Sequence, residues 1–101
     1  MLWMNEYDIE EAQRRFGRGD TPNLQRAATV LANLRDWTNE HSDGWPYWQK
    51  PSRAAARLMT LIQSADRWDP TDCTAGQVDS ACVPIRSFLT RQGADKAEVF
   101  A

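Results

Sequence analysis

Residues 21–41 read TPNLQRAATVLANLRDWTNEH, and this stretch decides the fold class. Thr21 is a good N-cap, and Pro22 suits the first helical position, where its missing N–H leaves no hydrogen bond unmade. Core-type side chains then recur every three or four residues, the period of one helix face. They are Leu24, Ala27, Ala28, Leu31, Leu34 and Thr38, with Val30 and Trp37 widening the stripe. The stretch predicts a helix from Pro22 to about Glu40 or His41, ended by residues 42–44.

A helix is also predicted before this stretch, from about Asn5 to Phe16. Ile9, Ala12 and Phe16 share one face of it, and Gly17 suits the left-handed position that follows a helix. Acidic residues open this segment and arginines close it, as the helix dipole favours.

The third helical segment is predicted to start near Pro51 or Ser52 and to end near Ala65 or Trp68. Asp69-Pro70 then breaks the chain. Its apolar stripe consists of Ala55, Leu58, Met59, Ile62 and Ala65, with Ala54 and Leu61 on the flank.

The fourth segment begins with Thr71 or Thr74 as its cap, and Thr74 with Gln77 fits a capping box. Its stripe is Val78, Cys82, Ile85 and Leu89. Pro84 falls inside and should kink the helix. The stripe keeps its phase across Pro84, which favours one kinked helix over two, and Gly93 ends it.

No segment alternates in period two, and no Asn-Gly hairpin turn occurs. We therefore predict an all-α fold, a compact bundle of about four helices joined by short loops. Residues 1–101 are expected to form a single helical domain, with 94–101 a partly ordered tail. The predicted core residues are Leu31, Leu34, Leu58, Ile62, Ile85 and Leu89.

Composition narrows the class of protein further. Twelve Lys and Arg against 14 Asp and Glu give a net charge of -2, which argues against a basic scaffold for non-specific DNA binding. The longest apolar run is the four residues Met1 to Met4, whereas a membrane helix needs about 20. The first Arg, Arg14, follows several acids, which is unlike a signal peptide. We expect a cytoplasmic protein with no membrane partner.

The two cysteines, Cys73 and Cys82, are expected to be small buried or half-buried residues in a reducing compartment. If both lie on one helix, they are about 13 Å apart, too far for a disulfide. His41 is the only other soft ligand, whereas structural zinc requires four. Neither a metal site nor any other cofactor is predicted.

The most unusual stretch is Trp45-Pro46-Tyr47-Trp48-Gln49-Lys50-Pro51, an aromatic-rich loop between the second and third segments. Large rings dominate interface hot spots, so the loop is a candidate binding platform. The same rings could instead close one end of the bundle, because a small domain has little core to spare. The candidate binding residues are Trp45, Tyr47, Trp48, Lys50, Arg53 and Arg57.

Arg53, Arg57 and Arg67 also suggest a helix-turn-helix motif with the third segment in the major groove of DNA. The link before that segment is too long for a helix-turn-helix motif, and alanines offer little to base edges. His41 adjoins Ser42 and Asp43, but sequence neighbours at a helix end usually point in different directions. The acidic first segment is read as a solvated turn favoured by the dipole. We find no catalytic motif and no catalytic residue.

Several phrases of the chain resemble small uncharacterised proteins encoded by actinobacterial phages and related mobile elements. They are Thr21-Pro22-Asn23-Leu24, Trp37-Thr38-Asn39, Ser42-Asp43-Gly44-Trp45, Tyr47-Trp48 and Phe88-Leu89-Thr90-Arg91-Gln92-Gly93. The resemblance extends from about Tyr7 to Gly93. It implies a setting, the bacterial cytoplasm during phage or prophage gene expression, and no mechanism.

The leading hypothesis is a non-enzymatic adaptor or inhibitor that binds a host or phage protein, or a second copy of itself. The alternative is a nucleic-acid-binding accessory protein that uses the Arg53 and Arg57 side of the third helix. A second alternative is an enzyme whose site has no recognisable motif.

Overall fold

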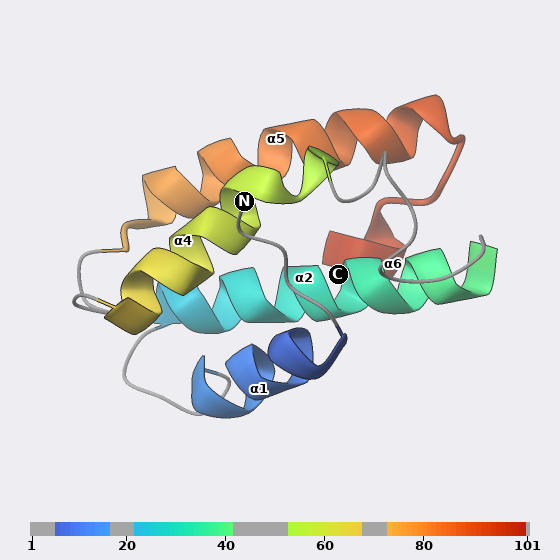
Figure 1. Cartoon of the computed structure of the whole chain (residues 1–101). Helices are drawn as coiled ribbons and strands as arrows, with labels where there is room; N and C mark the ends of the chain where they lie inside the picture. The colour runs from blue at the N-terminus through green and yellow to red at the C-terminus, as the bar shows by residue number, and fades with distance from the viewer. Residues whose placement is uncertain (1–5, 17–21, 42–52, 68–72, 101) are drawn as a thin grey trace.

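The computed structural model of the chain describes residues 6–16, 22–41, 53–67 and 73–100. Its helices are α1 (Glu6–Phe16), α2 (Pro22–His41), α4 (Ala56–Arg67), α5 (Ala75–Arg91) and α6 (Ala97–Phe100) (Figure 1). These ranges contain no strand, so the all-α prediction is confirmed for them. The predicted number of about four helices is too low, because the described residues form five. The aromatic-rich stretch lies outside these residues.

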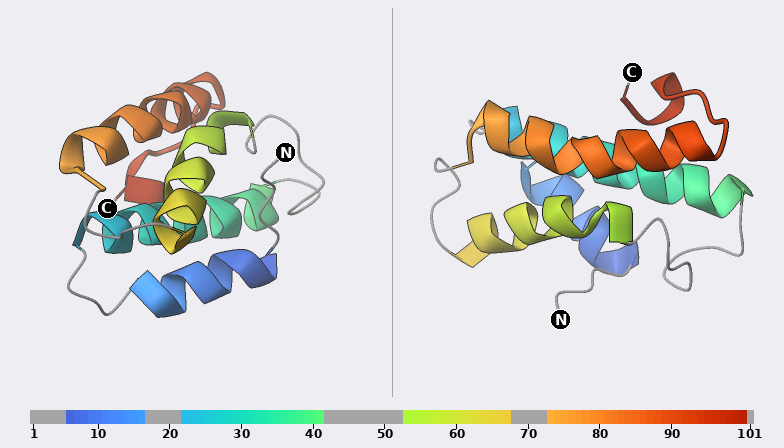
Figure 2. Two further views of the ribbon diagram at one scale, coloured as in Figure 1. Left: turned by 60° about the vertical axis from the view of Figure 1, so that its left-hand side comes forward. Right: turned by 90° about the horizontal axis from the view of Figure 1, so that it is seen from above.

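Helix α2 is the central element, because it packs against α1, α4, α5 and α6. Figures 1 and 2 show α1 on the opposite side of α2 from α5. The predicted bounds of α2 are confirmed, and every member of its predicted stripe is buried. Ala32, outside that stripe, is buried as well. A helix with neighbours on several sides buries more than one stripe.

The other long helices turn their predicted apolar faces inward. Ile9, Ala12 and Phe16 of α1 are buried, as are the central positions of α4 and α5. The six predicted core residues expose at most 2% of their surface. Their burial confirms the spacing argument: residues three and four apart share one face of a helix.

Both ends of α5 follow its sequence signals. At the start, Gln77 N donates to Thr74 Oγ1 at 3.2 Å, and Thr74 N donates to Gln77 Oε1 at 2.9 Å. The capping box is therefore confirmed. α5 continues through Pro84 as one helix. At the end, Gly93 has a φ of 68°, and the N–H groups of Gly93 and Ala94 donate to the carbonyls of Thr90 and Leu89, the Schellman arrangement.

The start of the third segment differs from the prediction of one helix from Pro51 or Ser52. Residues 51 and 52 lie outside the described ranges, residues 53–54 are helical, and Ala55 forms a turn before α4 begins at Ala56. The Ala55 carbonyl accepts the N–H of Met59 at 2.9 Å. The sequence gives no sign of this break, because an alanine run has high helix propensity.

Helix α6 lies within the segment predicted as a partly ordered tail. Its Val99 is fully buried, and α6 packs on α2. A four-residue helix is too short to show a helical period and too short to be stable alone. Contacts with the rest of the fold hold it in place.

Cys73, which precedes α5, and Cys82, which lies within it, are both buried, as predicted, and both are free. Burial raises the pKa of the Cys73 thiol, although the positive charge of Arg26 partly opposes this. Burial likewise raises the pKa of Cys82, with Arg86 and Arg26 opposing. Among the described helices, none is long and apolar enough to span a bilayer.

Candidate functional site

Two of the predicted binding residues, Arg53 and Arg57, lie where the third segment faces α5. Arg57 is on the first turn of α4, and Arg53 is on the helical residues just before it. The remaining predicted residues lie outside the described part of the chain; they are Trp45, Tyr47, Trp48 and Lys50.

Two cavities, each of about 620 Å³, lie one after the other along α5: the first faces α4, and the second faces residues 53–54 just before α4. On α4 and the residues before it, they are lined by Arg53, Ala54, Ala56, Arg57, Thr60 and Leu61. On α5 and its flanks, they are lined by Thr74, Gly76, Gln77, Ser80, Ala81, Pro84, Ser87, Phe88, Arg91 and Gln92. We call this surface the α4–α5 groove. The α5 positions follow one another turn by turn, so the cavities lie in succession along one seam.

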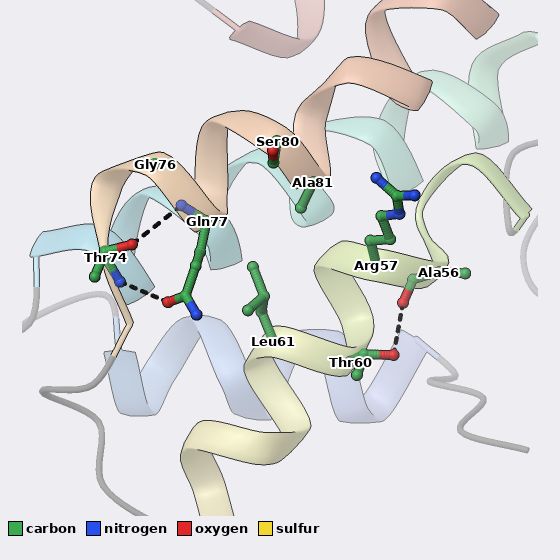
Figure 3. A pocket seen from close by; sticks show the side chains of 9 residues that line it. All are labelled: Ala56, Arg57, Thr60, Leu61, Thr74, Gly76, Gln77, Ser80 and Ala81. Atoms are coloured by element: carbon green, nitrogen blue, oxygen red, sulfur yellow. Dashed lines mark hydrogen bonds between the residues drawn. The ribbon is translucent and has the colours of Figure 1, made fainter.

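The first cavity has an apolar floor and a polar rim. In Figure 3, Leu61 and Arg57 rise from α4 toward α5, and Ala81 faces them. Two rim groups are already engaged: Thr60 Oγ1 donates to the Ala56 carbonyl at 2.9 Å, and Gln77 belongs to the capping box. The Arg57 guanidinium is therefore the charged group that this cavity offers to a ligand.

The second cavity lies beside the later turns of α5 and contains two arginines. Arg53 comes from the third segment and Arg91 from the last turn of α5. Pro84 and the buried ring of Phe88 supply apolar surface between them. Together with Arg57, these residues place three guanidinium groups along one groove.

The arginines of the α4–α5 groove differ from arginines elsewhere in the fold. Arg14 pairs with Glu11, Arg26 with Asp79 at 2.7 Å, and Arg35 with Asp36 at 3.0 Å. Arg86 stacks on the Phe100 ring at 4.0 Å. Within the described ranges, neither Arg53, Arg57 nor Arg91 forms an ion pair or a cation–π contact, so their charges are available to a partner.

Acidic side chains are also absent from the described lining of the α4–α5 groove. The carboxylates described elsewhere are Glu10, Glu11, Asp36, Glu40, Asp79, Asp95 and Glu98. The described lining of the groove therefore carries only positive charges, on a chain whose net charge is -2. This local excess of positive charge attracts negatively charged groups to the groove.

His41 is turned toward its own helix. Its ring stacks on Trp37 with centroids 4.6 Å apart, and Nδ1 lies 2.8 Å from the Trp37 carbonyl oxygen. Ser42 and Asp43, its sequence neighbours, lie outside the described residues. In the described part of the chain, no three His, Cys, Asp or Glu residues gather as metal ligands.

Arg53 and Arg57 were predicted from the sequence as binding residues, whereas Arg91 was not. A signal was present, because Ser80, Pro84, Ser87 and Arg91 recur every three or four residues along one side of α5. A helix face of small and polar residues is usually exposed to solvent. This face of α5 becomes the wall of a groove only because α4 lies beside it. No protein-family model, curated protein or solved structure matches the chain. The function is therefore inferred from the groove itself.

Proposed function

We propose that the protein acts by binding another protein, as an adaptor or an inhibitor, through the α4–α5 groove. The observation that supports this most directly is the set of three arginines that form no ion pair with any described residue and lie beside apolar surface. Arginine is enriched at protein interfaces and among the residues that dominate binding energy. An open groove with apolar surface and charged edges provides both burial and orientation for a partner.

The expected setting is the cytoplasm of a bacterium, with a phage or host protein as the partner. The resemblance of the chain to small proteins of actinobacterial phages supports this part of the proposal. We further propose that Trp45, Tyr47, Trp48 and Lys50 extend the contact surface. Single alanine substitutions of the three rings would test this: loss of partner binding at an unchanged melting temperature supports it, and loss of stability in all three contradicts it.

Nucleic-acid binding is the second candidate, because Arg91 adds a third cation to the predicted Arg53 and Arg57 side. It is less favoured on two physical grounds. Affinity for nucleic acid comes largely from many phosphate contacts, and three arginines supply few of them. The apolar floor formed by Leu61 and Ala81 also has no use in contacting a phosphate backbone.

Site-specific photocrosslinking in the native cells tests the proposal. A benzophenone amino acid is placed at Ser80 or Ser87 in the groove and, as the control, at the exposed Gln13 on α1. We expect one protein to crosslink from both groove positions and not from Gln13. That protein is then purified, and its binary complex with the chain is measured by titration calorimetry. Crosslinks that are equal at all three positions, or made only to nucleic acid, contradict the proposal.

A further inference from the structure

We infer that the segment bound in the α4–α5 groove is an acidic amphipathic helix of the partner protein. This inference rests on the proposed function and specifies the chemistry of the partner. Its apolar side would lie on the groove floor, and its carboxylates would meet Arg53, Arg57 and Arg91.

The shape of the groove favours a helix. Its lining on α5 runs from Gly76 to Gln92, which corresponds to roughly 24 Å, or a helix of about 16 residues. The missing side chain at Gly76 and the small side chains at Ser80 and Ser87 let a neighbouring helix approach closely, and packed helix axes lie about 8–10 Å apart. An amphipathic helix laid in an apolar groove is an established mode of recognition between proteins.

Two other occupants fit the groove less well. An extended peptide needs hydrogen-bond partners for its backbone, and a groove between two helices offers no sheet edge, whereas a helix satisfies its own backbone groups. Pockets for small molecules usually bury most of the ligand in one concave site of about 300–1,000 Å³. Here two cavities of about 620 Å³ each follow one another along an open seam.

Charge complementarity specifies the acidic character of the helix. Arg53, Arg57 and Arg91 have no ion pair within the described ranges, and no acidic residue of these ranges lines the groove. Planar guanidinium groups bind carboxylates through two parallel hydrogen bonds. Because Arg53 and Arg91 share the second cavity, we expect most of the partner's carboxylates at that end.

An exposed apolar side chain, Val83, lies on α5 outside the lining of the two cavities. Val83 exposes 57% of its surface and is the large hydrophobic residue found exposed among those described. It lies three residues after Ser80 and four before Ser87, so it shares their side of α5. A helix seated in the groove would cover Val83, whereas a phosphate backbone gains nothing from it.

Peptide selection tests the inference without assuming a sequence. A display library of random peptides of about 16 residues is selected against the full chain. Enriched peptides are synthesised with a fluorescent label and measured by anisotropy. We expect apolar residues at helical spacing, flanked by Asp and Glu. Peptides that are basic or uncharged, peptides without helical spacing, or no enrichment at all would overturn the acidic helix.

Variants then locate the bound peptide. Arg53→Glu, Arg57→Glu and Val83→Asp should each weaken the Kd by about tenfold or more, while Arg14→Glu on α1 should change it by less than about twofold. Circular dichroism verifies that every variant keeps its helix content. A peptide with Lys in place of its acids should bind the Arg53→Glu/Arg57→Glu variant and not the native chain. Failure of this charge exchange also overturns the inference.

Three further results separate this inference from the proposed function. If the selected peptides are not acidic helices, and Ser80→Trp abolishes their binding, the inference of an acidic helix is wrong. The proposal that the groove binds a protein then still stands. Binding of a labelled DNA duplex that is lost in the arginine variants would favour nucleic acid and overturn both. The third result is sedimentation in which the native chain is a dimer and Arg57→Glu is a monomer. This result would identify a second copy of the chain as the occupant of the groove and overturn the inference of a partner's acidic helix.

Discussion

Asn33 on α2 and Val99 on α6 are joined by a hydrogen bond across 66 positions of the chain, with the Asn33 Nδ2 donating to the Val99 carbonyl at 3.0 Å. The Val99 side chain is fully buried at the same contact. On the neighbouring residue, the ring of Phe100 stacks under the Arg86 guanidinium of α5. One polar bond, one buried side chain and one cation–π contact therefore attach α6 to two other helices.

Removing the Asn33 side chain should loosen α6 selectively. In Asn33→Ala we expect faster hydrogen exchange at the amides of Val99 and Phe100, both of which donate to the Lys96 carbonyl. Val99→Ala should accelerate this exchange more, because full burial of a valine side chain stabilises the folded state by about 1.5–3 kcal/mol. Exposed Gln13→Ala serves as the control. Unchanged exchange at both amides in Asn33→Ala would show that the hydrogen bond does not hold α6.

Truncation of the central core side chains should lower global stability. Leu31 and Leu58 are fully buried, so replacing either by alanine should reduce the free energy of unfolding by about 2–5 kcal/mol. Val83→Ala is a matched control, because this apolar side chain is mostly exposed and the change should stay within about 0.5 kcal/mol. Urea denaturation followed by circular dichroism measures all three. Equal midpoints for Leu31→Ala and the native chain would contradict the assigned core.

The end of α5 should be sensitive to Gly93 for reasons of backbone conformation alone. A Cβ at this position would meet no atom within 4 Å, but the φ of +68° is one that L side chains rarely adopt. Gly93→Ala should therefore destabilise the chain by about 1–2 kcal/mol. Gly76→Ala, on the first turn of the same helix, should leave stability equal or higher. D-alanine at position 93, introduced by chemical synthesis, should restore native stability.

The buried thiols should make stability fall at alkaline pH. Burial raises the pKa of Cys82 above its ordinary value of 9.0, so the unfolded chain loses this proton at a lower pH than the folded chain. Above about pH 9 the unfolded state binds fewer protons, and the free energy of unfolding decreases as the pH rises. The double variant Cys73→Ala/Cys82→Ala lacks both thiols. The difference between its pH profile and that of the native chain therefore isolates the contribution of the cysteines from other titrations. Identical pH profiles of stability for the native chain and the double variant would contradict this contribution from the thiols.

The raised pKa of the Cys73 and Cys82 thiols also predicts that both are alkylated slowly. With iodoacetamide the folded chain should react slowly at pH 7 and still gain rate above pH 9, because the thiolate is the nucleophile. In urea the rate should level off near the ordinary pKa of 9.0. Mass spectrometry of the two cysteine-containing peptides measures both rates.

Local signals in the sequence were sufficient for most of the helices. The stripe of α2 predicted its bounds, because a helix between several neighbours needs apolar residues at helical spacing along its whole length. Thr74 with Gln77, and Gly93, marked the two ends of α5, because capping and a positive φ depend on a few consecutive residues. These features are determined within about one turn of the chain, and the sequence displays them directly.

The groove and α6 required the tertiary structure. Arg91 is one of several solvent-facing positions on α5 until α4 lies beside it, and Arg53 comes from a segment 38 positions earlier. Val99 becomes a core residue only because Asn33 and the surface of α2 receive it. By itself the sequence determined the helical class, the core stripes and the caps of α5. Which exposed charges share a surface was decided by helix packing, because that depends on crossing geometry between distant residues rather than on any local pattern.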